Sequence, residues 1–484
     1  MENWLHKQAD LKPNQLALIA ENKQYTFAQL EQIVIKRAQQ LMTILDDNRR
    51  VGVLTTNCLA GYVTILALQQ LGRQLVLLNR RLAKPELEDQ IDQAQLTQIV
   101  QDDAFELDLS NTQQFTFHYL SQLAGQPAEI LADFKEDQVT SIMFTSGTTG
   151  RPKGVEQSFG NHFYSAMGSV LNLGLLPDDC WLAAVPIFHI SGFSIMMRSL
   201  IYGIPVRLYD HFDAHQINAD LLAGRGSIIS LVPVMFEKML ADLPRNQAYP
   251  ASFRQVLLGG GPVKQVTLVA SQTRGISITQ CYGMTETASQ IIALNPKDAA
   301  AKLGSVGKPL FPVSLRIVQQ DSEGLGQLEV KAPNIAVGYL NQADKYQASF
   351  DDGWFKTGDL GWQDDEGFIY IKGRQGDMIS SGGENVFPQE IEAVYRHLPE
   401  IEDMVVVGVP DTQWGSVPVA LVKFKSDAFL SVADLRNYGR EQLAHYKVPH
   451  DFVEYSNDWP RTASGKIQRY RLVTEYQNIK KRPS

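Results

Sequence analysis

The stretch Thr140-Ser-Ile-Met-Phe-Thr145-Ser-Gly-Thr-Thr-Gly-Arg-Pro-Lys-Gly154 joins an apolar, strand-like lead to a turn rich in glycine and hydroxyl residues. Glycines let the backbone approach a phosphate closely, hydroxyls and amides supply neutral donors, and Lys153 adds a positive charge. The spacing is wrong for a Walker A loop, because Lys153 is followed by Gly154 rather than by Ser or Thr. Composition leaves two interpretations open, a surface turn and a phosphate-binding loop.

Short apolar runs and helical patterns alternate on both sides of this loop. Arg50–Leu54 and Gln74–Leu78 have the pattern of strands, and Leu59–Leu71 and Pro85–Ala94 that of helices. The same rhythm returns over residues 228–258. This alternation predicts βαβ units and therefore parallel sheets.

The pattern of predicted helices and strands changes twice towards the C-terminus. From about Gly304, short strands separated by Gly, Pro and Asp turns predict a β-barrel-like part over about residues 304–375. After Gln375–Gly376 come a helical pattern, two strand patterns, a second helix ending near Leu443 and a tail. The predicted fold is thus α/β, with an N-terminal domain at 1–375 and a small α+β C-terminal domain at 376–484.

Composition excludes several classes of protein. The chain has 484 residues, and its 44 Lys and Arg against 53 Asp and Glu give a net charge of −9. Without a basic excess to neutralise phosphates, no nucleic acid is expected as a partner. Three widely spaced cysteines argue against a disulfide scaffold and favour a reducing cytoplasm. We expect no transmembrane segment, because no run of about 18 apolar residues occurs, and the N-terminus lacks a signal-peptide pattern.

Four other segments contain residues suited to nucleotide chemistry, and each also has an ordinary structural explanation. Thr285 and Glu286, within Gln280–Ala288, suit a phosphate–Mg²⁺ unit, or a strand-to-helix turn with Thr285 as N-cap. Asp359 suits ribose hydroxyls or an Asx-turn. Lys466 lies on a Gly/Ser turn, where most lysines are merely solvated. The glycines of Leu258–Pro262 are common in loops of every kind.

Two side chains stand out against apolar surroundings. His189 is surrounded by apolar neighbours, where a satisfied core histidine is the ordinary outcome. Arg198 lies within the apolar run 190–206, where an unpaired charge would be costly. It therefore requires an anionic partner, either an Asp or Glu of the protein or a carboxylate of a ligand.

Taken together, in this order and spacing, the segments resemble those of the adenylate-forming superfamily, which includes acyl-CoA synthetases, peptide-synthetase adenylation domains and firefly luciferase. The resemblance covers essentially the whole chain. Its carriers are Thr145–Gly154, Tyr282-Gly-Met-Thr-Glu286, Thr357-Gly-Asp359, Gly373-Arg374, Ser381-Gly-Gly-Glu-Asn-Val386 and Gly465-Lys466.

The resemblance implies an acid–thiol ligase with two half-reactions, in which a carboxylate first attacks the α-phosphate of ATP and a CoA thiol then displaces AMP. It implies Mg²⁺ with ATP, held by Glu286, and CoA as co-substrate. Thr285, His189 and Lys466 are the expected catalytic group, with Thr285 at the α-phosphate and His189 near the reacting carbonyl. The expected ATP-binding residues are Thr145, Ser146, Gly147, Thr148, Thr149, Gly150, Lys153, Gly260, Gly261, Tyr282, Gly283, Asp359 and Arg374.

The resemblance also implies a C-terminal domain that moves between the half-reactions. Lys466 would neutralise charge during adenylation and then withdraw, with Gly376 as the hinge. Gly382, Gly383 and Glu384 would then face the pantetheine of CoA. Gly376 departs from the family pattern, which has Asp or Lys there, but glycine permits the required backbone rotation.

A narrower resemblance concerns the acid. Phe188–Gly192, Tyr282–Gln290 and Lys302–Pro312 are similar to the corresponding stretches of the 2-succinylbenzoate–CoA ligases of menaquinone biosynthesis, a branch of this superfamily. That likeness implies a substrate with a second carboxylate, for which Arg198 is the expected partner, and Ser191 as a further substrate residue. A ligase for another aryl or fatty acid and a carrier-loading adenylation enzyme remain alternatives, and a homo-oligomer stays open.

Overall fold

The computed structural model describes residues 1–82, 84–105, 109, 112–145, 152–261, 263–381, 384–412, 414–443, 445–461 and 467–481. The chain forms two compact units. Unit 1 consists of Met1–Leu315 and Val330–Phe355, and unit 2 of Arg316–Glu329 and Lys356–Ser484. The expected hinge at Gln375–Gly376 falls inside unit 2, in a short 3₁₀ turn, η2 (Gln375–Asp377), and stays a prediction.

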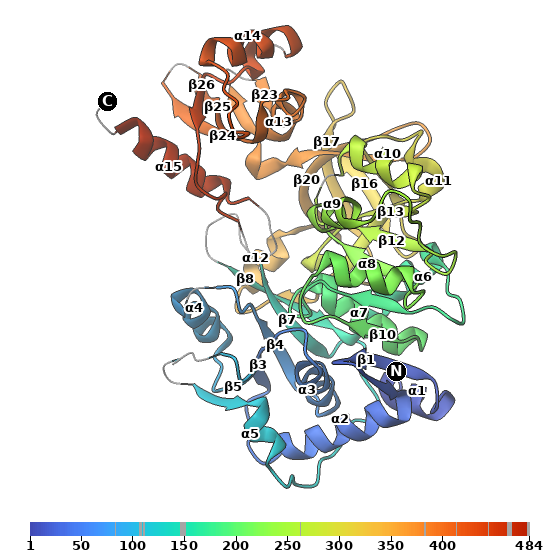
Figure 1. The fold of residues 1–484 in the computed structure, drawn as a ribbon. Helices are drawn as coiled ribbons and strands as arrows, with labels where there is room; N and C mark the ends of the chain where they lie inside the picture. The colour runs from blue at the N-terminus through green and yellow to red at the C-terminus, as the bar shows by residue number, and fades with distance from the viewer. Residues whose placement is uncertain are drawn as a thin grey trace. The chain divides into compact units, whose positions relative to one another are not determined.

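Unit 1 contains a seven-stranded sheet in the order β18-β8-β7-β4-β3-β5-β6. Strands β7, β4, β3, β5 and β6 run parallel, and β8 and β18 are antiparallel additions at one edge. The strands are β3 (Arg50–Leu54), β4 (Gln74–Leu78), β5 (Gln98–Gln101), β6 (Gln113–Thr116), β7 (Val139–Thr145), β8 (Lys153–Ser158) and β18 (Gly338–Tyr339). The helices between strands of this sheet are α3 (Leu59–Gln70), α4 (Lys84–Ala94) and α5 (Phe117–Ser121), and α2 (Phe27–Leu41) precedes β3, so the predicted βαβ units are confirmed (Figure 1).

A second set of strands in unit 1 follows the order β15-β14-β13-β12-β11-β9-β10-β1-β2. Strands β13 to β1 of this order are parallel, whereas β14, β15 and β2 pair antiparallel. The strands are β1 (Leu16–Ala20), β2 (Lys23–Thr26), β9 (Trp181–Ala183), β10 (Val206–Leu208), β11 (Ile228–Leu231), β12 (Gln255–Leu258), β13 (Ile278–Met284), β14 (Ser289–Leu294) and β15 (Ser305–Pro309). The remaining elements of this unit are α1 (Trp4–Leu11), α6 (Phe159–Leu173), α7 (Ile190–Tyr202), α8 (Ala214–Leu222), α9 (Pro233–Asp242), α10 (Gln265–Thr273), η1 (Thr285–Thr287), α11 (Pro296–Ala299), α12 (Ala343–Ala348) and β19 (Phe350–Asp351).

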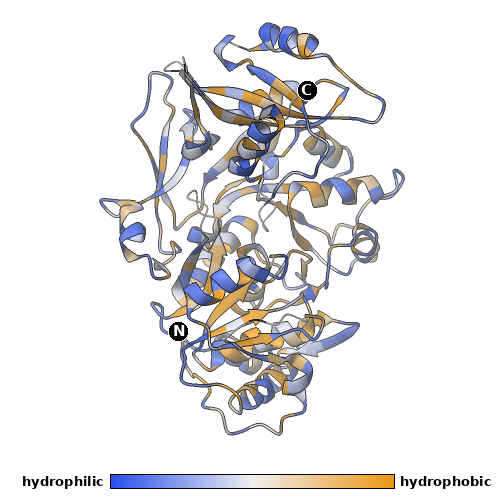
Figure 2. Ribbon diagram, turned by 90° about the vertical axis from the view of Figure 1, so that its left-hand side faces the viewer, coloured by the Kyte–Doolittle hydropathy of each residue, from blue (hydrophilic) through white to orange (hydrophobic). Residues whose placement is uncertain are grey.

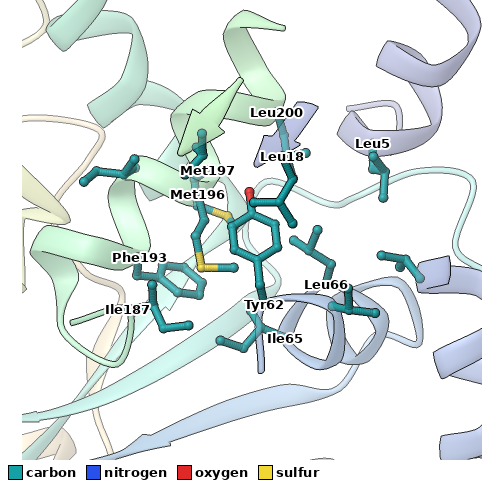
Figure 3. Packing of buried hydrophobic residues seen from close by; sticks show 14 of the residues in the cluster. Leu5, Leu18, Tyr62, Ile65, Leu66, Ile187, Phe193, Met196, Met197 and Leu200 are labelled. Carbon is teal, nitrogen blue, oxygen red and sulfur yellow. The ribbon is translucent and has the colours of Figure 1, made fainter. Parts of the chain in front are cut away.

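The main core of unit 1 joins helices from both halves of its sequence. Tyr62 on α3 is fully buried, and its ring lies among Phe193, Met196 and Leu200 of α7 (Figure 3). Figure 2 shows hydrophobic residues gathered on the inner strands, with hydrophilic residues on the outward faces of the helices. Helix α7 is thus held from its apolar side, and this burial fixes the position of Arg198 on it.

Unit 2 begins with strands β16 (Ser314–Val318), β17 (Gly326–Lys331), β20 (Trp354–Gln363) and β21 (Ile369–Arg374), adjacent in that order. These are the short strands that the sequence predicts for the barrel-like part. A sheet in the order β23-β22-β25-β24, with β26 beside β25, follows. Its elements are β22 (Ile379–Ser381), β23 (Glu384–Val386), α13 (Pro388–Tyr395), β24 (Ile401–Asp411), β25 (Gly415–Phe424), α14 (Val432–Gln442), η3 (His445–Lys447), β26 (Asp451–Glu454) and α15 (Arg469–Lys481).

The prediction of a tail after Leu443 is wrong. The segment forms β26, which pairs parallel with β25, and helix α15. Strand β26 is anchored in the core through Phe452 and helix α15 through Leu472, both of which are buried against β24 and β25. Among the described residues, no helix combines the length and apolarity needed to span a membrane.

Candidate active site

The parallel strands of unit 1 place several expected site residues at their carboxyl ends. Thr145 ends β7, Gly260 and Gly261 follow β12, and Thr285 follows β13. Strands β12 and β13 are neighbours, with Leu258 paired to Gln280, so their following loops leave the same edge. Ligands bind at this edge in open α/β sheets, which makes it the candidate site.

Lys153 and Glu286 come from different sheets of unit 1 and lie in contact although they are far apart in the sequence. Lys153 begins β8, opposite Thr145 in register. Its Nζ lies 2.6 Å from Glu286 Oε1 and 2.8 Å from the hydroxyl of Tyr339. Burial alone would lower the pKa of Lys153, but Glu286 and Tyr339 outweigh it and raise that pKa. The lysine is therefore a full cation held next to the carboxylate expected to bind the metal.

Tyr339 is a site residue that sequence reasoning missed. Its ring lies under the Lys153 ammonium, 4.1 Å from centroid to Nζ, which adds a cation–π contact. The ring packs edge-on against Tyr346 at 5.4 Å. The only local signal was an aromatic residue in the short strand Gly338–Tyr339, and nothing in the sequence pairs that strand with β8.

Most of the expected phosphate-binding residues and several residues of the C-terminal part lie outside the described residues. Ser146, Gly147, Thr148, Thr149 and Gly150 fall there, as do Gly382, Gly383 and Lys466. Thr145 is described, and its Oγ1 is buried with no hydrogen-bond partner among the described residues. A buried hydroxyl left without a partner at the start of this loop suits a polar ligand group.

The Thr285–Glu286 turn is preceded by a close crossing of two strands. Tyr282 is half-buried near the end of β13, and Gly283 pairs with Gln290 on β14. A Cβ at Gly283 would collide with the carbonyl of Ser289, so glycine is required there. After the neighbouring strand β12, Gly260 has φ +83 and is exposed.

A Mg²⁺ ion held with ATP fits the groups at this edge. Glu286 is largely buried and supplies oxygen ligands, and the described residues contain no cluster of three or more His, Cys, Asp or Glu that would form a complete protein cage. Mg²⁺ typically binds one or two carboxylates together with substrate phosphates and water. A single carboxylate therefore matches a metal that arrives with a nucleotide.

Helix α7 presents the three residues expected to face the acid. His189 is its N-cap, half-buried rather than enclosed in the core, with its ring 4.6 Å from that of Phe188. Ser191 is exposed in the first turn. Arg198 lies further along the same helix, and its side chain is one of the largest that is fully buried.

Arg198 has polar and aromatic partners but no carboxylate among the described residues. Its Nη2 donates to Ser289 Oγ at 3.1 Å, and its guanidinium lies 5.3 Å from the ring centroid of Trp181. Its Nε is buried without a hydrogen-bond partner. Burial lowers the pKa of Arg198, yet arginine stays charged in proteins. Of the two partners that the sequence allowed, the protein carboxylate is not found in the described part of the chain.

His162 is a second buried group that sequence reasoning missed. Its ring lies 5.0 Å from Phe193 on α7. Burial and then the nearby charge of Arg198 lower its pKa from 6.5 to about 3. His162 is therefore neutral at physiological pH, and it adds no second positive charge beside Arg198.

In unit 2, Asp359 and Arg374 form an ion pair. They are opposite each other in the β20–β21 ladder, and Arg374 Nε lies 2.8 Å from Asp359 Oδ1. Asp359 is in the middle of a strand rather than in the turn that the sequence left open. The Asp359 side chain is buried and the Arg374 side chain is about one-third exposed, at 37%. The ion pair and the strand ladder together fix the position of the Asp359 carboxylate.

The remaining hinge and CoA residues are placed only in part. Gly376 lies in η2, and Arg374 and Asp377 on either side of it line a shallow cleft in unit 2 with Phe387 and Arg469. Glu384 begins β23, which pairs antiparallel with β22.

The comparisons with known proteins identify the class. Residues 5–340 match the family of AMP-binding enzymes, and residues 390–466 match the AMP-binding enzyme C-terminal domain. The chain therefore belongs to the AMP-binding enzyme family.

Individual members of the family show more specifically what the chain is similar to. The chain is 42% identical to the 2-succinylbenzoate–CoA ligase of Listeria monocytogenes, over 98% of this chain and 99% of that protein. The structure of the o-succinylbenzoate CoA synthetase of Bacillus subtilis, in complex with the acyl-adenylate intermediate, superposes with a TM-score of 0.92 at 37% identity and covers 98% of both chains. ATP-bound MatB of Rhodopseudomonas palustris is less similar, with a TM-score of 0.88 and 27% identity over 99% of this chain and all of that one.

Proposed function

We propose that the protein joins 2-succinylbenzoate to CoA at the expense of ATP, through an acyl-adenylate, with release of AMP and pyrophosphate. Full-length relatives with this activity in their names support the reaction. The observation in the structure that carries the choice of acid is Arg198, a fully buried cation whose described partners are Ser289 and Trp181 and include no carboxylate. A substrate with a second carboxylate supplies the missing counter-charge.

In the first half-reaction, an oxygen of the acid attacks the α-phosphorus of ATP, and the bond to the β-phosphate breaks. Because anions must approach one another, catalysis consists mainly of charge neutralisation and positioning. Lys153 and the loop that precedes it hold the outer phosphates, Thr285 contacts the α-phosphate, and Lys466 balances the charge near the reacting carboxylate. When bound at Glu286, Mg²⁺ supplies further neutralisation of the triphosphate.

Binding of the nucleotide requires Lys153 and Glu286 to exchange partners. In the structure each neutralises the other across 2.6 Å. A phosphate takes the place of the carboxylate next to Lys153, and Glu286 is released for the metal. Tyr339 keeps its contact with the ammonium throughout, so the lysine stays aimed at the site while the pair separates.

The nucleoside is positioned by other groups. Tyr282 near the end of β13 and the glycines Gly260 and Gly261, which follow the neighbouring strand β12, hold the adenine ring. Asp359, oriented by Arg374, accepts hydrogen bonds from the ribose hydroxyls.

In the second half-reaction, the sulfur of CoA attacks the acyl carbonyl, the bond to the AMP phosphate breaks, and the thiol proton is released. Lys466 must leave the site before the thiol enters, which requires the C-terminal part to rotate about Gly376. Gly382, Gly383 and Glu384 then line the path of the pantetheine. His189, at the start of α7, borders the acyl group; it need not act as a base, because the acid is already ionised at neutral pH.

The decisive experiment measures acyl-CoA formation from ATP, CoA and one of three acids: 2-succinylbenzoate, benzoate and a medium-chain fatty acid. We expect thioester from succinylbenzoate only. Efficient reaction of either other acid, or failure with succinylbenzoate, would refute the proposed substrate. Reaction with free CoA would also exclude a carrier-loading adenylation enzyme.

A variant tests the role of Arg198 in that choice. Arg198→Met keeps much of the buried volume and removes the charge. We expect the KM for succinylbenzoate to rise by about 30-fold or more, because loss of one partner of a buried, hydrogen-bonded charge pair costs about 2–5 kcal/mol. The KM for ATP should stay unchanged. An unaltered KM for the acid would show that its second carboxylate binds elsewhere.

A further inference from the structure

The turn that contains Thr285 and Glu286 is held by its main-chain carbonyls. Each of the four consecutive carbonyls of residues 285–288 accepts a hydrogen bond from a different residue of unit 1. The Thr285 carbonyl accepts from Gln157 Nε2 at 2.6 Å, and the Glu286 carbonyl from the Ala336 amide at 2.7 Å. The Thr287 carbonyl accepts from Asn334 Nδ2 at 2.7 Å, and the Ala288 carbonyl from Ser165 Oγ at 2.7 Å.

This turn needs such support, because its end is conformationally costly. Ala288 has φ +48 and Ser289 has φ +114, both in the left-handed half of backbone space although neither is glycine. Residues of this kind cost about 1–3 kcal/mol each and persist only where the surroundings fix them. The four donors therefore select one conformation of the segment on which the presumed catalytic side chains are mounted.

Gln157 differs from the other donors because its own orientation is fixed by a buried polar chain. Its Oε1 accepts from Ser141 Oγ at 3.0 Å, and that hydroxyl oxygen lies 2.9 Å from His162 Nε2. Ser141 and Gln157 are paired residues of β7 and β8, and all three side chains are buried.

The directions of the protons follow from this chain. Ser141 has one hydroxyl proton and gives it to Gln157, so its oxygen accepts the Nε2 proton of His162. The glutamine amide is then oriented with its NH₂ towards the Thr285 carbonyl. Every link is satisfied only in this arrangement, so each of these buried polar side chains has a hydrogen-bond partner.

We infer that Gln157 is a positioning residue for adenylate formation: it ties the Thr285 carbonyl to β8, the strand that also carries Lys153. Thr285, Glu286 and Lys153 are thereby held in one frame. The inference rests on the proposed function for the reaction that these residues serve. It concerns the nucleotide side of the site and not the identity of the acid.

The test compares two buried glutamines. Gln157→Met preserves the side-chain length and removes the donor, while the Thr285 carbonyl keeps its hydrogen bond from the Ala288 amide at 3.1 Å. Gln69→Met is the matched control, because Gln69 is equally buried and donates to Thr140 of β7 at 3.0 Å without touching the 285–288 turn.

Two quantities are measured for each variant. The first is kcat for adenylate formation at saturating ATP and acid, for which we expect Gln157→Met to lose about 10- to 100-fold, the usual cost of removing a group that orients a metal or catalytic ligand. The second is the affinity for ATP with Mg²⁺, measured by calorimetry with no acid present, which should fall by about tenfold. Gln69→Met should change both by less than about twofold at a similar drop in melting temperature.

The inference would be overturned if both variants lost activity in proportion to stability, or if Gln157→Met kept both quantities within about twofold of wild type. Should Gln157→Met fail to fold, Ser141→Ala decides, because it leaves the amide present but no longer oriented. A loss of about fivefold or more in the affinity for ATP with Mg²⁺ supports the role, and an unchanged affinity refutes it. Because calorimetry uses no acid, these outcomes are distinct from a failure of the wild type with succinylbenzoate.

Discussion

Acidification from pH 7 to pH 5 should destabilise unit 1 through a single buried histidine. His162 is 2% exposed, and burial followed by the charge of Arg198 lowers its pKa from 6.5 to about 3. In the unfolded chain the imidazole takes up a proton as the pH falls below 6.5, whereas in the folded protein it does not. Protons thus bind preferentially to the unfolded state between pH 6.5 and about 3.

The sign and size of the effect follow directly. Stability rises with pH across this window and is lost as the pH falls through it. At pH 5, about 1.5 pH units below the unfolded pKa, the loss attributable to His162 is about 2 kcal/mol, at 1.36 kcal/mol per unit. At pH 7 it is close to zero, because the unfolded imidazole is then mostly neutral as well.

The assay is urea-induced unfolding at pH 7 and at pH 5, for the wild type and His162→Gln. Glutamine can retain a hydrogen bond to Ser141 and does not titrate. The wild type should lose about 2 kcal/mol more than the variant between the two pH values. His118→Gln, at an exposed position, is the control and should follow the wild type. If His162→Gln and the wild type lose equal stability, the buried, neutral state assigned to this imidazole is wrong.

Three further changes test the nucleotide side of the site. Lys153→Met should slow adenylate formation by about 100-fold or more in a pyrophosphate-release assay. The double variant with Glu286→Gln should lose much less activity than the two single variants lose in sum, on a free-energy scale, because the two residues form one ion pair. Strictly additive losses would contradict their coupling. Lys466→Ala should abolish adenylate formation yet still convert supplied acyl-adenylate to thioester, and equal loss of both half-reactions would argue against a moving C-terminal part. Asp359→Asn, which breaks the ion pair with Arg374, should raise the KM for ATP by about tenfold without changing the KM for the acid, and an unchanged KM for ATP would remove Asp359 from the ribose site.

Local pattern was enough for much of the secondary structure. The strands predicted at Arg50–Leu54 and Gln74–Leu78 are β3 and β4 with the same bounds, and the helix between them differs by one residue at its end. Short apolar runs between turn residues leave few alternatives, since hydrophobic periodicity is a property of neighbouring residues. The prediction of a tail after Leu443 failed because local pattern does not report long-range packing. Helix α15 has a mostly polar sequence, and it is stabilised by packing of Leu472 on strands that are distant in the sequence.

For the candidate site too, the sequence determined some features and only the tertiary structure decided others. The sequence by itself determined which chemical groups are present and, through their order along the chain, the family to which they belong. Only the tertiary structure decided the partners: Lys153 with Glu286 and Tyr339, Arg198 with Ser289, and Gln157 with the Thr285 carbonyl. Each contact joins segments brought together by strand register and helix packing, and residues that are distant in sequence carry no local periodicity from which such a pairing could be inferred.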